Sequence, residues 1–454
     1  MEQINREHPE YAANQAMWRR YADLYTGGEQ FRRNATEYLT RRSKEPQEVY
    51  GERVSRAFYE NYIGSIIDWY AATLMRREPT LICEGPNESG RQFFNAFTED
   101  CDRRGTNLSE FFRRQLVDVL IYGRSYTAVE FPRFAEPVTS RAEEDAAGRS
   151  RAYLVSYTPR DLINWSRDDD GNFEWVVLRS RELRADATSS SGWRQETRWV
   201  RYDRENFHIY RAHEGGEIEL TDNGRHGLAA LGRVPLFATE VTDGLWLMNK
   251  GAQLQLEHFN KSNALSWALT MGLFAMPVVY SEREWNQIAG ESYYIQLGPD
   301  DRFGWTEPEG HVFQIAQDNL VRLKDEIYRV CYLMTQAGGT STANVSQSGL
   351  SKQRDHSVTQ EVLRAYGDAV RETMKQTLRA IASARRDGLR VDVTGVDDFD
   401  IADFGGELDD AKKLLDLGIE SPTLKRQLFK KLAFKYFADA EQSTKDAIAR
   451  EIDG

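Results

Sequence analysis

The sequence has few cysteines and no short motif that is typical of an enzyme or a metal site. The three Cys among 454 residues form no CxxC pair and no paired framework, which favours a reducing compartment. No phosphate-binding GxxxxGKS/T loop, HExxH zinc motif or GxSxG nucleophile motif occurs, and the seven His are scattered. We therefore predict a protein that is not an enzyme and that uses no cofactor and no metal.

Long hydrophobic runs are also missing. The longest apolar stretch, at 269–280, has about a dozen residues and contains Pro277, whereas a membrane-spanning helix needs roughly 20. The first ten residues, MEQINREHPE, lack the basic and then apolar segments of a signal peptide. We expect a protein that has no membrane partner.

Basic residues are fewer than acidic residues in this chain. The chain has 71 acidic and 59 basic residues, which gives a formal net charge of −12. A protein that grips duplex DNA gains affinity when Lys and Arg displace counterions from phosphates, so this balance argues against tight DNA binding. It is compatible with a surface along which DNA moves, and equally with an acidic surface that only favours solubility.

What the chain does contain is apolar and aromatic residues in two kinds of pattern. Apolar residues make up 40% of the chain and aromatic residues 11%, which favours substantial cores and interfaces between proteins. Apolar side chains recur at three- and four-residue spacing before about residue 122 and after 243, as in amphipathic helices. Between 151 and 240, segments such as AYLVSYTP and NFHIYRA are strand-like. We predict a mainly helical α+β fold with a β-rich region.

Caps and breakers predict where several elements begin and end. We expect one helix over 55–78, with Phe58 on its apolar stripe and Pro79 ending it. Asn107 is expected to cap the helix before the β-rich region. The segment DDDGNF at 168–173 is expected to form a hairpin turn, because its Gly does not fit the EF-hand register and no Glu follows at the required position.

The second half contains three long predicted helices, at 243–275, 318–337 and 356–388. Between the last two lies GGTSTANVSQSGLSKQ, at 338–353, with almost nothing to bury. So long a connection between two amphipathic helices is usually functional or disordered.

Two finer predictions concern the C-terminal half. Asp318 or Asn319 is expected to cap the helix that begins there. In the tail, three short helical segments are expected, and four residues of the middle one have the spacing of a buried face: Leu424, Leu428, Leu432 and Tyr436.

The order of these segments, together with particular residues, resembles the portal proteins of tailed bacteriophages. The N-terminal residues that carry the resemblance are His8-Pro9-Glu10-Tyr11, Trp18, Tyr21, Tyr25-Thr26-Gly27-Gly28, Tyr38-Leu39, Tyr50, Arg53, Ala57-Phe58 and Asn61. The later segments are DVLIYGRSYTAVEFP, YTPRDLINW, GNFEWVVLR, LGRVPLF, GWTEPEGH and DLGIESPTL. The resemblance therefore extends over nearly the whole chain, and it rests on order and spacing because none of these segments is chemically diagnostic.

The resemblance implies a division of the chain. A wing of N-terminal helices and a β-rich region (1–242) would be followed by a first stem helix (243–275), a small α/β clip (276–317), a second stem helix (318–337), a tunnel loop (338–355), a long wing helix (356–388) and a helical C-terminal crown (389–454).

It also implies a function. Portal proteins form a homo-oligomeric ring of about twelve subunits at one capsid vertex. Double-stranded DNA enters through the channel during packaging and leaves through it during ejection, without sequence-specific contacts. The expected partners are the large terminase subunit, a head–tail adaptor or neck protein, and the major capsid and scaffolding proteins. Such a protein is made in the cytoplasm of a bacterial host and resides in the virion. About twelve copies at −12 each would sum to about −144, so most of the ring would repel DNA.

The resemblance assigns candidate residues to three places. The DNA-channel loop would contain Gly338, Gly339, Thr340, Ser341, Asn344, Ser346, Ser348, Lys352 and Arg354. The stem helices would contribute Lys250, Gln253, Glu257, Lys261, Arg322, Lys324 and Glu326. The clip, which docks the motor and then the adaptor, would present Glu282, Arg283, Trp285, Tyr293, Tyr294 and Trp305. Small polar loop residues would let DNA pass with weak contacts; Lys352 and Arg354 would either touch phosphates or solvate the next helix.

Two alternatives stay open. In the first alternative, the chain is another helical virion structural or adaptor protein without a DNA channel. A globular monomer in solution would favour this hypothesis. In the second alternative, the chain is an enzyme whose site assembles from distant residues. A deep pocket that contains titratable groups with perturbed pKa values would favour this hypothesis.

Overall fold

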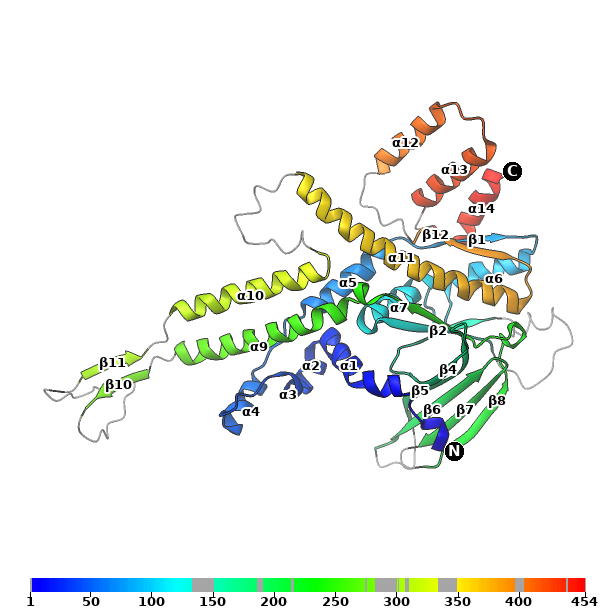
Figure 1. The fold of residues 1–454 in the computed structure, drawn as a ribbon. Helices are drawn as coiled ribbons and strands as arrows, with labels where there is room; N and C mark the ends of the chain where they lie inside the picture. Colours follow the sequence, from blue (N-terminus) through cyan, green and yellow to red (C-terminus); the bar gives the residue numbers. More distant parts are fainter. Residues whose placement is uncertain are drawn as a thin grey trace. The chain divides into compact units, whose positions relative to one another are not determined.

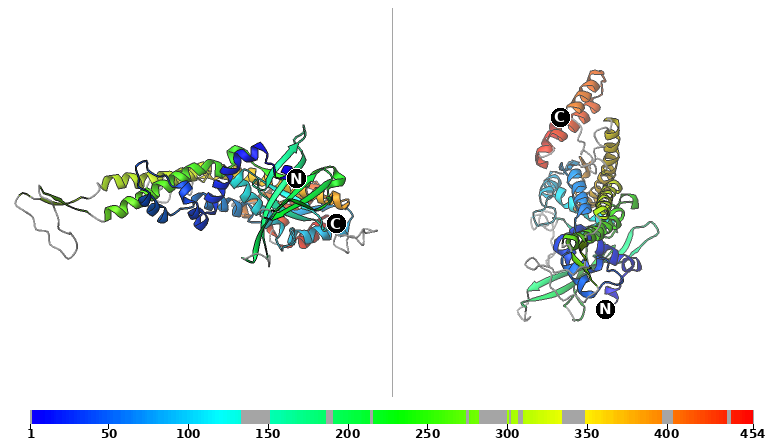
Figure 2. Two further views of the ribbon diagram at one scale, coloured as in Figure 1. Left: turned by 90° about the horizontal axis from the view of Figure 1, so that it is seen from below. Right: turned by 90° about the vertical axis from the view of Figure 1, so that its left-hand side faces the viewer.

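The structure is a computed structural model that consists of two compact units. It describes residues 2–132, 151–185, 191–213, 216–273, 276–281, 300, 302–306, 310–333, 349–396, 404–437 and 440–453. Unit 1 comprises Met1–Ala22, Ser65–Lys250 and Gln347–Gly454, and unit 2 comprises Asp23–Gly64 and Gly251–Ser346. Helices and small antiparallel sheets are both present, so the predicted α+β class is confirmed (Figures 1 and 2).

The N-terminal part is a series of helices. They are η1 (Glu2–Asn5), α1 (Pro9–Thr26), α2 (Gly28–Arg33), α3 (Ala35–Tyr38), α4 (Gln47–Ser55) and α5 (Tyr62–Leu74). The single helix predicted over 55–78 is wrong, because α4 ends at Ser55 and α5 begins at Tyr62. Asn61 explains the break: its Oδ1 accepts a hydrogen bond from Gly64 N at 2.9 Å, and its Nδ2 donates to Tyr25 O at 2.7 Å. Phe58 lies in the break and is exposed.

Helices α6 (Glu88–Glu99) and α7 (Leu108–Tyr122) precede the first large sheet. The predicted cap of α7 is confirmed, since Asn107 Oδ1 accepts a hydrogen bond from Glu110 N at 2.7 Å. Helix α7 ends at Gly123, whose φ of 81° is in the left-handed region that favours glycine.

Two antiparallel sheets of unit 1 share one hydrophobic core. The three-stranded sheet has the order β3-β2-β9, and the five-stranded sheet is the meander β4-β5-β6-β7-β8. Their strands are β2 (Arg124–Glu130), β3 (Tyr153–Tyr157), β4 (Leu162–Arg167), β5 (Phe173–Ala185), β6 (Trp193–Asp203), β7 (Asn206–His213), β8 (Glu219–Arg225) and β9 (Leu236–Glu240). The core contains Tyr126 from the first sheet and Val176 and Tyr202 from the second. The predicted hairpin turn is confirmed: Asp168 N donates to Asn172 O at 2.9 Å, between β4 and β5.

Long helices dominate the second half. After η2 (Ala229–Leu231) and η3 (Asp243–Leu245) come α9 (Leu247–Leu273), the hairpin strands β10 (Met276–Tyr280) and β11 (Arg302–Thr306), α10 (Gly310–Val330) and α11 (Gly349–Arg385). Helix α11 has 37 residues, so it is about 55 Å long. Its buried line includes Tyr366, Val370 and Leu378.

Two predicted helix starts are wrong. Helix α10 begins at Gly310, so Asp318 and Asn319 lie inside it and do not cap it. The HVFQIA segment, predicted as the end of the clip, continues the helical pattern, and Gln314 Nε2 donates to Asp318 Oδ1 one turn later at 2.9 Å. Helix α11 begins at Gly349, so 349–355, predicted as part of the tunnel loop, is helical.

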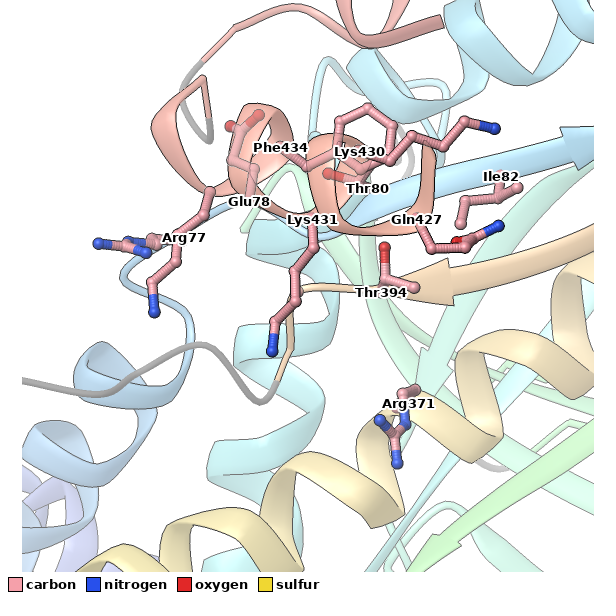
Figure 3. A pocket seen from close by; sticks show the side chains of 12 residues that line it. Arg77, Glu78, Thr80, Ile82, Arg371, Thr394, Gln427, Lys430, Lys431 and Phe434 are labelled. Carbon is pink, nitrogen blue, oxygen red and sulfur yellow. The ribbon is translucent and has the colours of Figure 1, made fainter. Parts of the chain in front are cut away.

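The last helix of the chain packs against a small sheet. Strand β1 (Thr80–Glu84) pairs with β12 (Arg390–Thr394), and α12 (Phe404–Asp416), α13 (Pro422–Tyr436) and α14 (Gln442–Asp453) follow. Gln442 of α14 binds Leu81 of β1 through both amide atoms, donating to its O at 2.7 Å and accepting from its N at 3.1 Å. A cavity of about 270 Å³ lies between the β1–β12 sheet and α13 (Figure 3).

The buried face predicted for α13 is wrong. Leu424 is 36% exposed and Tyr436 is 70% exposed, whereas Lys435 is only 6% exposed. Helix α13 lines the cavity with Lys430, Phe434 and Lys435, so its inward side is amphipathic and the aliphatic row points partly to solvent.

Candidate functional site

The long helix pair of unit 2 contains most of the predicted stem residues. The part of α9 in unit 2 and α10 run antiparallel and lie side by side in both orientations, with the β10–β11 hairpin between them in the sequence (Figures 1 and 2). Lys261 Nζ of α9 donates to Asn319 Oδ1 of α10 at 3.2 Å. The hairpin pairs Met276 with Thr306 at one end and Tyr280 with Arg302 at the other.

Two buried amides on α9 hold the chain between α4 and α5. Asn263 Nδ2 donates to Phe58 O at 2.9 Å, and Phe58 N donates back to Asn263 Oδ1 at 3.0 Å. Gln255 Nε2 donates to Glu60 O at 2.7 Å, and its Oε1 accepts from Ile63 N at 3.2 Å. The break between α4 and α5 leaves backbone groups without helical partners, and these amides satisfy them. This is why polar residues stand on the apolar face of α9.

His258 lies between these two amides and is also buried. Its ring stands edge-on to the Tyr62 ring, with centroids 5.0 Å apart, and its Nδ1 is 3.7 Å from Glu60 Oε2. Burial lowers the pKa of His258; Glu60 opposes this shift, and Lys324 adds to it. The imidazole is therefore neutral at pH 7 and acts as a packing element of unit 2.

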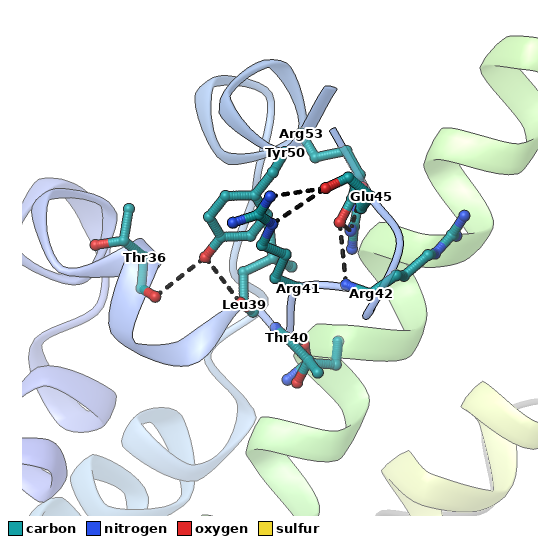
Figure 4. Close-up of polar contacts among 9 residues, drawn as sticks. Thr36, Leu39, Thr40, Arg41, Arg42, Glu45, Tyr50 and Arg53 are labelled. Carbon is teal, nitrogen blue, oxygen red and sulfur yellow. Dashed lines mark hydrogen bonds and ion pairs between the residues drawn. The ribbon is translucent and has the colours of Figure 1, made fainter. Parts of the chain in front are cut away.

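A buried ion pair closes the connection between α3 and α4 (Figure 4). Arg53 Nη1 donates to both carboxylate oxygens of Glu45 at 2.8 Å, and Arg42 N donates to Glu45 Oε2 at 3.1 Å. Arg53 is the main cause of the lowered pKa of Glu45. Tyr50 OH donates to the carbonyl oxygens of Thr36 and Leu39, at 3.1 and 3.0 Å. Tyr50 and Arg53, which belong to the sequence resemblance, thus have structural roles here.

The predicted stem residues of α9 fall into two groups. Gln253, Glu257 and Lys261 follow one another at four-residue spacing and form an exposed polar face, on which Glu257 and Lys261 are paired at 3.1 Å. Lys250 belongs to unit 1, where its Nζ donates to Gly244 O at 3.0 Å beside the start of the helix.

On α10, Arg322 is exposed and Lys324 and Glu326 are partly buried. Glu326 pairs with Arg329 at 2.7 Å, which the sequence reasoning did not single out. The pairs Glu257–Lys261 on α9 and Glu326–Arg329 on α10 each match one acid with one base, so the described part of the helix pair presents mixed charge.

Among the described side chains of this helix pair, sequence reasoning missed four that are aliphatic and exposed: Leu269 at 42%, Val312 at 61%, Ile315 at 55% and Val321 at 45%. Val312 and Ile315 are three residues apart and share a face of α10. The signal was present in HVFQIA, but it was attributed to the clip. Aliphatic side chains that are neighbours on one exposed helix face, as Val312 and Ile315 are, offer a small apolar surface for contact with another protein.

The other predicted positions lie outside what the structure describes. This holds for the loop residues Gly338, Gly339, Thr340, Ser341, Asn344, Ser346 and Ser348 and for the clip residues Glu282, Arg283, Trp285, Tyr293 and Tyr294. Lys352 and Arg354 belong to helix α11, and Trp305 to strand β11, where it is the partner of Pro277; their side chains are outside the described part.

Two neighbouring carboxyl groups in unit 1, Asp118 and Asp161, have raised pKa values. Burial raises the pKa of Asp118 to about 7, and the nearby Asp161 contributes to this shift. Asp161 accepts hydrogen bonds from Thr158 N at 2.7 Å and Thr158 Oγ1 at 2.8 Å, so it organises the turn before β4. Neither carboxyl lines the cavity beside α13, so the pair has no adjoining substrate space there.

Within the described ranges, no three His, Cys, Asp or Glu side chains are placed to hold a metal ion. None of the helices in these ranges combines the length and the apolar character that a membrane span needs.

Comparisons with known proteins give one family match and several similar structures. Residues 249–381, from α9 into α11, match a family described as a domain of unknown function, DUF4055. One similar structure is from the neck of an empty GTA particle computed with C6 symmetry, with 12% identity, a TM-score of 0.47, and coverage of 81% of this chain and 90% of that chain.

Another is from the virion of a native gene transfer agent particle, with 12% identity, a TM-score of 0.43, and coverage of 87% and 96%. At this level, neither likeness establishes a shared fold. No curated protein matches the chain.

Proposed function

We propose that this chain is a subunit of the portal of a tailed phage or phage-like particle. In this proposal, copies assemble into a ring at one capsid vertex, around a channel for double-stranded DNA. The observation that carries the proposal is the antiparallel pair of helices α9 and α10, which the β10–β11 hairpin connects in the sequence. Exposed aliphatic residues lie on both helices of this pair. A single subunit leaves these side chains in water, and contact with a second copy would bury them.

The order of the segments that resemble portal proteins supports the same proposal. The quoted segments of the portal resemblance occur in order from His8 to Leu424, and they fall in both units. The stem would then be α9 and α10, the hairpin would belong to the clip, α12–α14 to the crown, and the loop before α11 would face DNA. Because Glu257 and Lys261 neutralise one another, the exposed face of α9 would bind DNA weakly, as passage requires.

The proposed partners follow from this role. The clip would dock the large terminase subunit during packaging and a head–tail adaptor afterwards, and capsid and scaffolding proteins would surround the ring. The subunit would contribute structure and no catalysis.

Native mass spectrometry and negative-stain electron microscopy of the full-length protein, over a range of concentrations and with scaffolding protein, test the proposal. We expect a ring of about twelve subunits with a central hole. A subunit that stays monomeric and globular under all these conditions would contradict the proposal and favour a structural protein without a channel.

A further inference from the structure

The cavity beside α13 is lined by basic side chains from three separate segments of unit 1 (Figure 3). Helix α13 contributes Lys430, Lys431 and Lys435, the segment before β1 contributes Arg77, and α11 contributes Arg371. Figure 3 shows Lys431 extending from α13 on the side toward Arg371, with Arg77 on its other side. Residues about 60 to 350 positions apart in the chain are thus brought to one space of about 270 Å³.

Some of these cations already have ion-pair partners in the chain. Lys430 Nζ is 2.5 Å from Asp453 Oδ2, and Arg371 pairs with Asp368. Lys431, by contrast, is exposed and has no ion pair or hydrogen bond with another described residue.

Arg77 also has a donor group without a partner. Its Nη1 is buried and has no hydrogen-bond partner in the described part of the chain. A buried guanidinium nitrogen without a partner costs free energy that an anion in the cavity would recover.

Negative charge at the cavity is small and is directed elsewhere. Glu78 is the one acidic residue among the described residues that line it, and its Oε1 accepts a hydrogen bond from Asn107 Nδ2 at 3.4 Å. Helix α13 itself has five basic and no acidic residues, in a chain whose net charge is −12. A local concentration of positive charge on an acidic protein indicates an anionic ligand.

We propose that this cavity binds a phosphate group, either of a small phosphate ion or of a nucleic-acid backbone. Arg77 and Lys431 would donate to its oxygens. The hydroxyl groups of Thr80 and Thr394, which are register partners across β1 and β12, line the same space and add neutral donors. A tetrahedral oxyanion accepts from several donors at once, and guanidinium groups bind phosphate through two parallel hydrogen bonds. The site does not depend on ring formation.

The test compares two double variants of the full-length protein that lose the same charge. R77Q/K431Q removes the two cations that we propose to bind the anion. R76Q/K425Q is the control, because Arg76 is the neighbour of Arg77, Lys425 belongs to α13, both are exposed, and neither lines the cavity. Pyrophosphate binding is measured by titration calorimetry, and binding of a fluorescein-labelled DNA duplex by anisotropy at fixed salt.

We expect the wild type and the control to bind pyrophosphate equally, and the cavity variant to bind it at least about tenfold more weakly. Loss of duplex binding by the cavity variant alone, with displacement of the duplex by pyrophosphate, would assign the phosphate to nucleic acid. Pyrophosphate binding without duplex binding would assign it to a small ion.

Equal weakening in both double variants, or no pyrophosphate binding by the wild type, would overturn the proposal. K431Q alone changes an exposed side chain and therefore keeps the test valid if R77Q impairs folding. Native mass spectra of the same samples report ring formation independently, so failure of this site and failure of the proposed function are distinguishable.

Discussion

At the residue scale, side-chain amides on α9 take the place of backbone partners. Asn263 and Gln255 each both donate to and accept from the chain at the α4–α5 break. An amide side chain carries the same donor and acceptor groups as a peptide unit, so it closes a gap that no apolar residue would close. Polar residues on an apolar helix face therefore mark an irregular segment packed against it.

Replacement of Asn263 by Ala tests this role. The variant leaves the N–H and C=O of Phe58 without partners, so we expect it to lower the free energy of unfolding by about 1–3 kcal/mol. Urea unfolding followed by circular dichroism measures the change. Gln253→Ala on the exposed face of α9 is the control and should stay within about 0.5 kcal/mol of the wild type. Equal effects of the two variants would refute the assigned role.

Asp118 makes stability depend on pH. Its pKa is raised from 3.8 to about 7, so the folded chain keeps a proton that the unfolded chain loses at lower pH. The folded state binds more protons between about pH 4 and pH 7, and stability therefore falls as pH rises through this window.

Asp118→Asn removes this dependence, so the melting temperature of the variant should rise relative to wild type as pH increases from about 5 to 8. Differential scanning calorimetry at several pH values gives the comparison. Asp169→Asn, in the exposed turn before β5, serves as the control and should follow the wild-type profile. A constant difference between Asp118→Asn and wild type would show that Asp118 does not titrate in this range.

At the scale of elements, Gln442 attaches α14 to the β1–β12 sheet. Gln442→Ala removes both hydrogen bonds to Leu81, and we expect the Leu81 amide and the amides of α14 to exchange with deuterium about tenfold faster or more. Ser443→Ala changes the next residue, which is exposed, and should leave exchange unchanged. Unchanged exchange in Gln442→Ala would mean that other contacts hold α14.

From the sequence, the presence of helices and strands could be predicted better than the residues at which they end and the sides that they bury. The Asn107 cap and the turn at Asp168 were correct because each depends on contacts within a few residues. The uninterrupted helix over 55–78 was wrong because Asn61 and Asn263 stabilise its break, and Asn263 is some 200 residues away. The prediction of a buried face on α13 was wrong because the cavity, which includes residues of the distant strand β1, determines which side of the helix turns inward.

The same reason limits prediction of the candidate site. The spacing of Gln253, Glu257 and Lys261 is local, so their common exposed face could be predicted from helical phase. The convergence of Arg77, Arg371 and Lys431 depends on tertiary packing, and no local pattern indicates it. Exposure of Val312 and Ile315 could not be predicted either, because hydrophobicity alone predicts burial.

At the scale of the whole molecule, the exposed aliphatic residues of α10 connect the single subunit to the proposed ring. V312D/I315D places two charges where the ring would bury apolar surface, and burying unpaired carboxylates is costly. We expect this variant to remain monomeric at concentrations at least about tenfold above those at which the wild type assembles. H311D/Q317D introduces the same two Asp residues at exposed polar positions of α10 and should still form rings. Native mass spectrometry across a dilution series distinguishes the outcomes. Assembly of V312D/I315D at the wild-type concentration would exclude this surface from the subunit interface and leave the portal proposal without its principal structural support.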